Sequence, residues 1–329
     1  MTKRNVPTGE AGEVGFGLSP MSDADFRQIH LSTLEVLERS GVFVEDDEAL
    51  DLYSDGGCAV DRDSHMVRIP PHVVEEAVAA APERVVAHGR DPDKDVVLEA
   101  GRLKFMNFSE GLEFVDPHSG ERRDSTNRDL ADIVRLADYL SEMDVVGVAV
   151  GSRDVAHEAA AAIHNTEAQL LNTTKPVDAI PLNRKDVQDI LEMAAVIAGG
   201  RDELRSRPIV FMGVCPVSPL KLPRETCEVT IECAREGIIN NVLSMAMSGA
   251  SSPVTLAGTL VVHNAEVLAA ITLAQLTERG APVLYGTSTT AMDLRLATAS
   301  VGSPECGMIG ACIAYMARRY CLPSFIAGA

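Results

Sequence analysis

The stretch Asn241-Val242-Leu243-Ser244-Met245-Ala246-Met247 decides the fold class, because it is a short apolar run followed by a long helical pattern at about 256–279. Similar apolar runs recur along the chain at residues 144–150, 176–180, 208–214, 282–286 and 323–327. Helical patterns separate them at about residues 158–171, 186–198, 224–236 and 304–320. Apolar strands that alternate with helices are typical of a parallel sheet covered by helices. The sequence therefore predicts an α/β fold.

The loops that follow the strands favour a (β/α)8 TIM-type barrel over an open sheet. They are longer and richer in Ser, Thr, Pro and Gly than the loops that precede the strands, as in barrels with a site at that end. An open doubly wound sheet usually carries a Gly-rich phosphate loop after its first strand, and Gly151-Ser152-Arg153-Asp154 is not one. Because a barrel needs eight strands and six are predicted, we expect an incomplete barrel that lacks roughly 80–100 residues.

The part of the chain before the repeating pattern divides into two further regions. Residues 1–20 are predicted to form a flexible arm, and residues 21–140 an α+β N-terminal region, followed by the partial barrel at 141–329. Ser22 with Asp25 predicts a helix start. A second helix is expected at 72–81, and short strands or turns at 42–44, 53–57, 66–69, 85–86, 96–98, 103–105 and 114–116.

Composition excludes several classes of function. The net charge of −19 argues against binding to nucleic acid. The polar start at residues 1–10 lacks the apolar core of a secretory signal. The sequence contains no run of 18 uninterrupted apolar residues, so no membrane span is predicted. The seven scattered cysteines contain no C-x-x-C motif, so we expect reduced thiols and a cytoplasmic protein. His263-Asn264-Ala265-Glu266 lacks the spacing of a zinc motif, and no bound metal is predicted.

Candidate site residues lie in the loops after the third, fourth and fifth strands and at the next helix start. They are Ser218, Met247, Thr287, Ser288 and Glu305. Each also has a structural interpretation. Ser and Thr before a helix are commonly N-caps, Met commonly fills a core, and a Glu at a helix start favours the helix dipole.

Several long motifs, in the same order along the chain, resemble the trimethylamine:corrinoid methyltransferase family from about residue 22 to the end. The motifs are Ile29-His30-x3-Leu34-Glu35-Val36-Leu37, Asp116-Pro117-His118-Ser119-Gly120-Glu121-Arg122-Arg123, Pro253-Val254-Thr255-Leu256-Ala257-Gly258-Thr259-Leu260, Val262-His263-Asn264-Ala265-Glu266-Val267-Leu268-Ala269, Pro282-Val283-Leu284-Tyr285-Gly286 and Gly302-Ser303-Pro304-Glu305.

The resemblance implies a βα-barrel with an N-terminal extension, assembled as a homo-oligomer. Members of this family move a methyl group from a methylated amine to the cobalt of a corrinoid (cobalamin) that a partner protein carries. One branch uses pyrrolysine, encoded by UAG, near the end of the sixth strand. We therefore expect a pyrrolysine directly after Ala329, and we expect the 329-residue chain by itself to be inactive.

The resemblance, together with positions at strand ends, suggests roles for the candidates. Tyr285 and Phe325 would form cation–π walls around the amine. Glu305 would be an ionisable partner, so that Glu305 and Tyr285 are the predicted catalytic residues. Ser218, Met247, Thr287, Ser288 and Phe325 would bind the substrate.

Two alternatives remain open. One is a glycine betaine or other quaternary-amine methyltransferase without pyrrolysine. The other is a non-catalytic fragment that oligomerises or binds the corrinoid protein. A lyase with a Schiff-base lysine is disfavoured, because Lys175 and Lys221 do not lie at strand ends.

Overall fold

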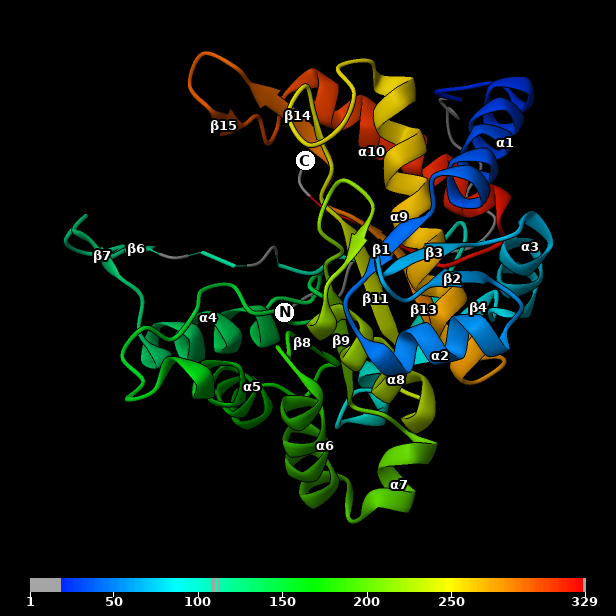
Figure 1. Cartoon of the computed structure of the whole chain (residues 1–329). Helices are drawn as coiled ribbons and strands as arrows, with labels where there is room; N and C mark the ends of the chain where they lie inside the picture. The colour runs from blue at the N-terminus through cyan, green and yellow to red at the C-terminus, as the bar shows by residue number, and fades with distance from the viewer. Residues whose placement is uncertain (1–18, 108–109, 112, 328–329) are drawn as a thin grey trace.

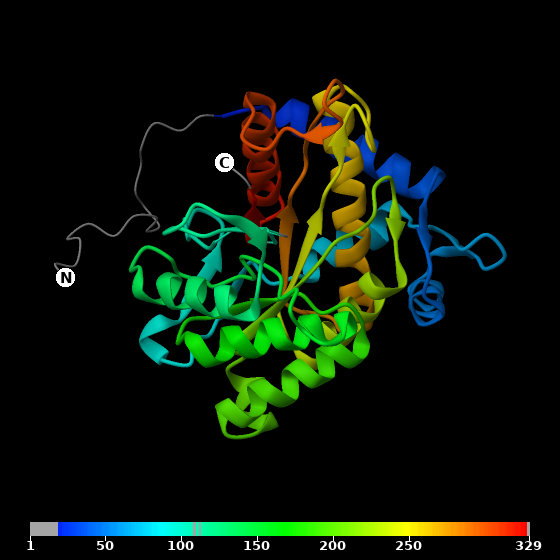
Figure 2. The ribbon, with the colours of Figure 1, turned by 90° about the vertical axis from the view of Figure 1, so that its left-hand side faces the viewer.

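A curled parallel sheet forms the centre of the molecule (Figures 1 and 2). The computed structural model describes residues 19–107, 110–111 and 113–327. The sheet has the order β16-β13-β11-β9-β8, and all its neighbours run parallel. In chain order its strands are β8 (Val177–Ala179), β9 (Val210–Val214), β11 (Asn240–Ser244), β13 (Val283–Thr287) and β16 (Ser324–Ile326). The α/β class is thus confirmed, and the sheet forms about half of a barrel wall.

The predicted first strand is only partly regular. Residues 144–150 make isolated parallel bridges, Val146 to Val177 on one side and Val145 to Met106 on the other. The cause is Asn107, whose amide donates to Gly147 O and accepts from Gly147 N, both at 3.0 Å, in place of a backbone partner. The described residues of 106–111 therefore run beside 144–150, although the sequence assigns them to the N-terminal region.

Helices cover the outer face of the sheet, and most begin and end within three residues of their predicted limits. They are α4 (Asn127–Tyr139), α5 (Ala161–Asn172) after η2 (Glu158–Ala160), α6 (Arg184–Ala198), α7 (Arg201–Ser206), α8 (Arg224–Glu236), α9 (Leu256–Thr277) and α10 (Pro304–Arg319). The short α7 and the helix α4 are not predicted from the sequence. In Figure 2, α9 and α10 stand beside the strands β11 and β13.

Helix α9 is the most buried helix of the fold. It packs against β11 and β13 on one side and against α8, α10 and the N-terminal helices on the other. By length and composition alone, α9 is the one helix within the described residues that could cross a membrane. In the structure, however, 72% of its most apolar 18-residue stretch is buried. This burial on both sides explains why its sequence shows no polar face.

The N-terminal region packs on α9 and supplies short strands and helices. Its elements are α1 (Asp23–Arg39), β1 (Val42–Val44), α2 (Asp47–Asp55), β2 (Ala59–Asp61), β3 (Met66–Arg68), α3 (Pro71–Ala80), β4 (Arg84–Ala87), η1 (Pro92–Lys94), β5 (Val96–Glu99), β6 (Glu113–Val115) and β7 (Arg122–Asp124). The capping box of Ser22 and Asp25 is confirmed. β1 also pairs in parallel with β10 (Lys221–Leu222), which lies in a loop of the barrel region.

Two predictions for this region are wrong. Tyr53 lies in α2 rather than in a strand or turn, because its hydroxyl donates to Ala269 O at 2.8 Å and fixes the helix against α9. Residues 103–105 form no strand, since this segment lines a cavity rather than pairing along its length. The predicted arm at 1–20 lies outside the described residues except for Ser19 and Pro20.

A small sheet stands above the carboxyl ends of β11 and β13. It consists of β12 (Met247–Ser248), β14 (Thr290–Asp293) and β15 (Thr298–Ala299). The predicted fourth strand therefore ends at Ser244, because Met247 pairs with Thr290 in this separate sheet. Short strands therefore follow β11 and β13 in the segments that the sequence predicts as loops.

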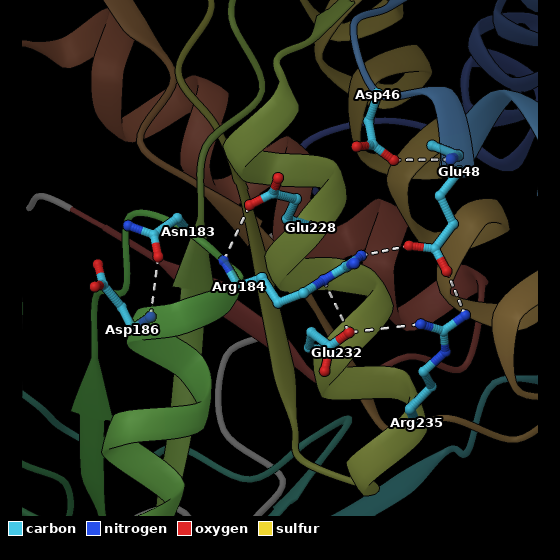
Figure 3. Close-up of polar contacts among 9 residues, drawn as sticks. Asp46, Glu48, Asn183, Arg184, Asp186, Glu228, Glu232 and Arg235 are labelled. Carbon is cyan, nitrogen blue, oxygen red and sulfur yellow. Dashed lines mark hydrogen bonds and ion pairs between the residues drawn. The ribbon is translucent and has the colours of Figure 1, made fainter.

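A closed ring of charges attaches α2 to the helices α6 and α8 (Figure 3). Glu48 pairs with Arg184 and, at 2.6 Å, with Arg235. Glu232 completes the ring with Arg184 at 3.1 Å and Arg235 at 3.5 Å. Glu228 adds a bond from the Arg184 backbone N at 3.0 Å. The ring joins the N-terminal region to the barrel region at a partly exposed position.

Candidate functional site

The alternation of side chains along the strands defines two faces of the sheet. Tyr285 points to the outer face, where it contacts α9, and its neighbours Leu284 and Gly286 therefore point to the inner, concave face. The inner face begins with an apolar layer at the amino ends of the strands, where Phe211 and Leu284 pack on the hairpin β4–β5. This layer closes the bottom of the half-barrel.

Asp178 lies on the inner face, where the sheet register pairs it with Phe211 of this apolar layer. It is 3% exposed, and its Oδ1 has no hydrogen-bond partner among the described residues. Burial raises the pKa of its carboxyl group to about 8, and no neighbouring charge opposes the shift. The backbone of Asp178 is held on both sides, since its N donates to Val146 O and its O accepts from Gln169 Nε2. The backbone at Asp178 is thus fixed, whereas its Oδ1 has no partner among the described residues.

Asn241 is a second buried polar group on the inner face. It is fully buried, and both its Oδ1 and its Nδ2 lack hydrogen-bond partners within the described ranges. Its side chain leans towards β13, because a Cβ on Gly286 would lie 2.6 Å from Asn241 Oδ1. A glycine is required at position 286 because a Cβ there would also lie 2.7 Å from the Val242 backbone O.

Gly213 lies between these two polar residues, on the intervening strand β9. It pairs with Asn241, and a Cβ placed on it would lie 3.7 Å from Asp178 Oδ1 and 3.5 Å from the Leu243 side chain. Further along β11, Leu243 is half-buried and Met245 is 48% exposed. Exposure on the inner face therefore increases towards the carboxyl ends of the strands, and Asp178 and Asn241 lie below that opening.

A cavity of about 470 Å³ lies on the β16 side of the inner face. Phe325, Leu284 and Phe105 line it, together with Tyr315 of α10. Phe325 pairs with Gly286 in the sheet register and so shares the inner face with it. The inner face thus offers both apolar walls and unpartnered polar groups, the usual composition of a small-molecule site.

The outer face carries a different polar cluster, centred on Glu266 of α9. Glu266 is fully buried and accepts hydrogen bonds from Ser244 Oγ at 2.6 Å, Ser218 Oγ at 2.8 Å and Leu220 N at 3.0 Å. Burial raises its pKa, and the three donors act against that shift. Glu266 therefore holds the loop after β9 and the end of β11 in one arrangement.

Two neighbours of Glu266 on α9 extend this cluster. Asn264 accepts from Tyr285 Oη at 2.6 Å and donates to Thr33 Oγ1 and to Tyr320 Oη. His263 Nδ1 lies 3.1 Å from Thr289 Oγ1, and burial lowers the pKa of this imidazole to about 3. The neutral His263 and its neighbours join the loop after β13 to α9, which makes this cluster a support for the carboxyl ends of the strands.

The chain matches the family described as trimethylamine methyltransferase (MTTB) over residues 15–329. It is 49% identical over 323 residues to the trimethylamine methyltransferase MttB of Desulfitobacterium hafniense (strain DSM 10664 / DCB-2), covering 98% of this chain and 65% of that protein. It is 43% identical to MttB of Methanosarcina thermophila, over all of this chain and 69% of that protein. The chain belongs to the trimethylamine methyltransferase family.

Two further proteins are similar to this chain at lower identity. The glycine betaine methyltransferase of Desulfitobacterium hafniense (strain Y51) is 29% identical over 92% of this chain and 63% of its own length. The crystal structure of the Methanosarcina barkeri monomethylamine methyltransferase MtmB superposes with a TM-score of 0.52 at 15% identity, over 92% of this chain and 67% of that one. This likeness supports the fold alone. The chain spans about 65% of the length of its D. hafniense MttB relative.

Within this family member, the structure places some of the predicted site residues on the inner face. Phe325 lines the cavity, and Ser288 follows Gly286 in the alternation and is half-buried. Met247 is half-buried in β12, above the end of β11. These three lie around the opening of the half-barrel, and their predicted roles in binding stay predictions.

The other predicted residues lie elsewhere. Tyr285 and Thr287 are fully buried on the outer face, so Tyr285 does not form a wall at the opening, because its hydroxyl is held by Asn264. Ser218 is engaged by Glu266. Glu305 is exposed in the first turn of α10, the helix-start position that also favours a carboxylate without any catalytic role.

Sequence reasoning missed Asp178, Asn241 and Glu266. Asp178 and Asn241 each interrupt an apolar strand run, and a polar residue inside such a run was the available signal. Glu266 lies in an apolar helix and gave the same signal. The direction in which each of these side chains points depends on the face of the strand or helix, which the sequence did not show.

Proposed function

We propose that this chain is part of a trimethylamine methyltransferase that moves a methyl group to the Co(I) of a cognate corrinoid protein. The carrying observation is the 49% identity, over 98% of the chain, to a protein named trimethylamine methyltransferase MttB. The lower identity to the glycine betaine enzyme makes quaternary amines the second candidate substrates. We also propose that the half-barrel is part of a complete (β/α)8 barrel, in line with the similarity to MtmB.

The proposed reaction breaks one C–N bond of the amine and forms one C–Co bond. The electron pair of Co(I) attacks the methyl carbon of the amine, and the electron pair of the C–N bond stays on nitrogen. If the amine is bound as trimethylammonium, the leaving group is therefore neutral dimethylamine. The inner face would bind the amine with its apolar walls and keep water away from the reacting carbon. Phe325, exposed to the cavity, would contribute a cation–π contact.

Further parts of the proposal concern partners and location. The corrinoid cofactor would be carried by the partner protein, and the enzyme would be a cytoplasmic homo-oligomer. The roles of Glu305, Ser218, Met247, Thr287 and Ser288 remain predictions from their sequence positions.

A methyl-transfer assay tests the function. The full-length protein is mixed with its corrinoid protein in the Co(I) state and with trimethylamine, glycine betaine or monomethylamine, and the absorption change to methyl-Co(III) is followed. We expect methylation with trimethylamine, together with stoichiometric dimethylamine. Methylation with glycine betaine alone would support the second candidate. If none of the three amines gave methyl-Co(III), both candidate substrates would be contradicted and a binding role would be favoured.

A further inference from the structure

The carboxylate of Asp178 is the least explained group on the inner face. A buried ionisable side chain normally finds an ion-pair or hydrogen-bond partner, because leaving it unpaired costs stability. Asp178 is 3% exposed, and neither an ion pair nor a side-chain hydrogen bond is formed by its carboxylate in the part of the chain that the structure describes. Burial is the sole cause of the raised pKa of this group, so no charged neighbour compensates it.

Asn241 provides an independent observation on the same face. Its amide is fully buried with both polar atoms unpartnered among the described residues, although amides readily form bonds with neighbours. Asp178 and Asn241 flank Gly213 on adjacent strands. Two unpartnered polar groups around one glycine indicate a site that a ligand completes.

We propose that Asp178 accepts a hydrogen bond from the N–H of a protonated tertiary amine, so that the site selects trimethylammonium over quaternary ammonium ions. This inference rests on the proposed function and names the residue that recognises the substrate. Trimethylammonium carries one N–H and one positive charge, which match one carboxylate. A quaternary ammonium ion carries the charge but no N–H.

The surroundings of Asp178 fit such an ion. Leu243 beside Gly213 supplies an apolar surface for the N-methyl groups of the ion. Gly213 keeps the space between Asp178 and Leu243 free of a side chain. The alternative is that ordered water molecules fill this space and satisfy both polar groups.

The protons balance in the proposed binding step. Below a pH of about 8 the free Asp178 is mainly protonated, as its raised pKa requires. Binding of trimethylammonium to the carboxylate form therefore releases one proton to the solvent. In the methyl transfer, the N–H remains on nitrogen, and dimethylamine leaves as the neutral molecule.

Isothermal titration calorimetry on the full-length protein tests the inference with two probes, trimethylammonium chloride and tetramethylammonium chloride. For the wild type we expect trimethylammonium to bind more tightly by on the order of ten- to a hundredfold, the usual contribution of a charge-assisted hydrogen bond. In D178N this preference should fall to within about threefold. The exposed Asp202 of α7 provides the matched control, and D202N should keep the full preference.

Proton release gives a readout that a merely structural residue would not change. Titrations at pH 7 in buffers of different ionisation enthalpy should show about one proton released per trimethylammonium bound to the wild type, and none for D178N. Equal binding of the two probes to the wild type, or unchanged preference and proton release in D178N, would overturn the inference and leave water as the partner of Asp178.

A steric variant keeps the inference testable if D178N does not fold. In G213A the added Cβ makes ordinary contacts at 3.5 and 3.7 Å, so the fold should be retained while the space beside Asp178 is filled. We expect trimethylammonium binding to weaken at least tenfold. Unchanged binding in a folded G213A would place the amine elsewhere.

The methyl-transfer assay, run in parallel, separates the two proposals. Selective binding without cobalt methylation would refute the proposed function and leave the recognition by Asp178 intact. Cobalt methylation by a D178N variant with unchanged KM for trimethylamine would refute the role of Asp178 and leave the proposed function intact.

Discussion

On the outer face of the sheet, buried Glu266 accepts three hydrogen bonds, whereas on the inner face buried Asp178 accepts none within the described residues. Asn264 on the outer face uses both ends of its amide, whereas neither end of the Asn241 amide on the inner face is hydrogen-bonded within the described part of the chain. The same sheet therefore carries two kinds of buried polar residue. Those on the outer face hold the loops in place, and those on the inner face are available to a ligand.

The comparison has three exceptions among the described residues, because Gln169 of α5 and Asn240 of β11, like His263, each keep one buried polar atom without a partner. His263 belongs to the outer cluster, yet its Nε2 has no partner among the described residues. The lowered pKa of this imidazole keeps it neutral, so its unpartnered nitrogen costs less than an unpartnered charge would. Below about pH 8 the raised pKa of Asp178 keeps that group neutral as well, but above that pH it carries a charge for which the described residues offer no partner.

The largest effect should come from the pH dependence of stability at Asp178. Its pKa is about 8 in the folded protein against an ordinary aspartate value of 3.8, so the folded state binds the extra proton. The contribution of Asp178 to stability is therefore greatest below pH 4, falls as the pH rises towards 8 and is constant above it. The total loss is about 6 kcal/mol in free energy of unfolding. Urea unfolding of ligand-free wild type and D178N at pH 4, 6 and 8 measures this. The difference in free energy of unfolding between the two proteins should change by about this amount from pH 4 to pH 8.

The control for this prediction is Asp129, whose pKa is lowered, first by the hydrogen bond from Arg123. Its contribution has the opposite sign, since it is present above the unfolded pKa and is lost on acidification. D129N should therefore lose stability relative to wild type at pH 6 to 8. Parallel curves for wild type and D178N would contradict the difference between the two faces.

The second effect concerns Glu266. E266A leaves Ser244 Oγ, Ser218 Oγ and Leu220 N without their acceptor, and it opens a cavity in α9. We expect a loss of about 4 kcal/mol in free energy of unfolding, measured in urea at pH 7. The exposed Glu192 of α6 is the control, and E192A should change stability by less than about 0.5 kcal/mol. A loss in E266A as small as that of E192A would mean that the outer cluster does not support the loops.

A smaller effect is expected for Tyr285. Y285F removes the hydroxyl that donates to Asn264 Oδ1 and leaves that oxygen buried without a donor. The cost should be about 1.5 kcal/mol in free energy of unfolding. Because Tyr285 lies on the outer face, the KM for trimethylamine should not change. A clear rise in KM would restore the sequence-based prediction that Tyr285 forms a wall around the amine.

The smallest effect is expected in the charge ring of Figure 3. E48Q removes the carboxylate that Arg184 and Arg235 share, at a position about one-third exposed. Solvent screening limits the cost to about 1 kcal/mol, and high salt should reduce it further. Denaturation of wild type and E48Q at low and at molar salt measures this. A cost that salt leaves unchanged would show that the ring behaves like the buried cluster around Glu266.

Most of the fold could be predicted because its signals are local. The helix α8 begins and ends at the predicted residues, and the capping box of α1 is formed by Ser22 and Asp25 as predicted. The prediction failed where a distant residue intervened. Asn107 takes the backbone partners of Gly147, and the Tyr53 hydroxyl is bound by Ala269 O, far away in the chain.

The candidate site was harder to predict than the fold. Loop positions directed attention to the carboxyl ends of the strands, where Ser288 and Met247 lie near the opening. They did not reveal which residues face inwards. Tyr285 and Asp178 both lie within strands, and only the register of the sheet assigns one to the outer face and the other to the inner face.

The sequence by itself determined the α/β class, the order of strands and helices and the family, because apolar periodicity and long motifs can be recognised without knowledge of contacts. Only the tertiary structure decided which buried polar groups are satisfied. Glu266 meets donors from residues 218, 220 and 244, while Asp178 meets none among the described residues. A hydrogen bond depends on atoms brought together from distant parts of the chain, and the curvature and register of the sheet set those distances.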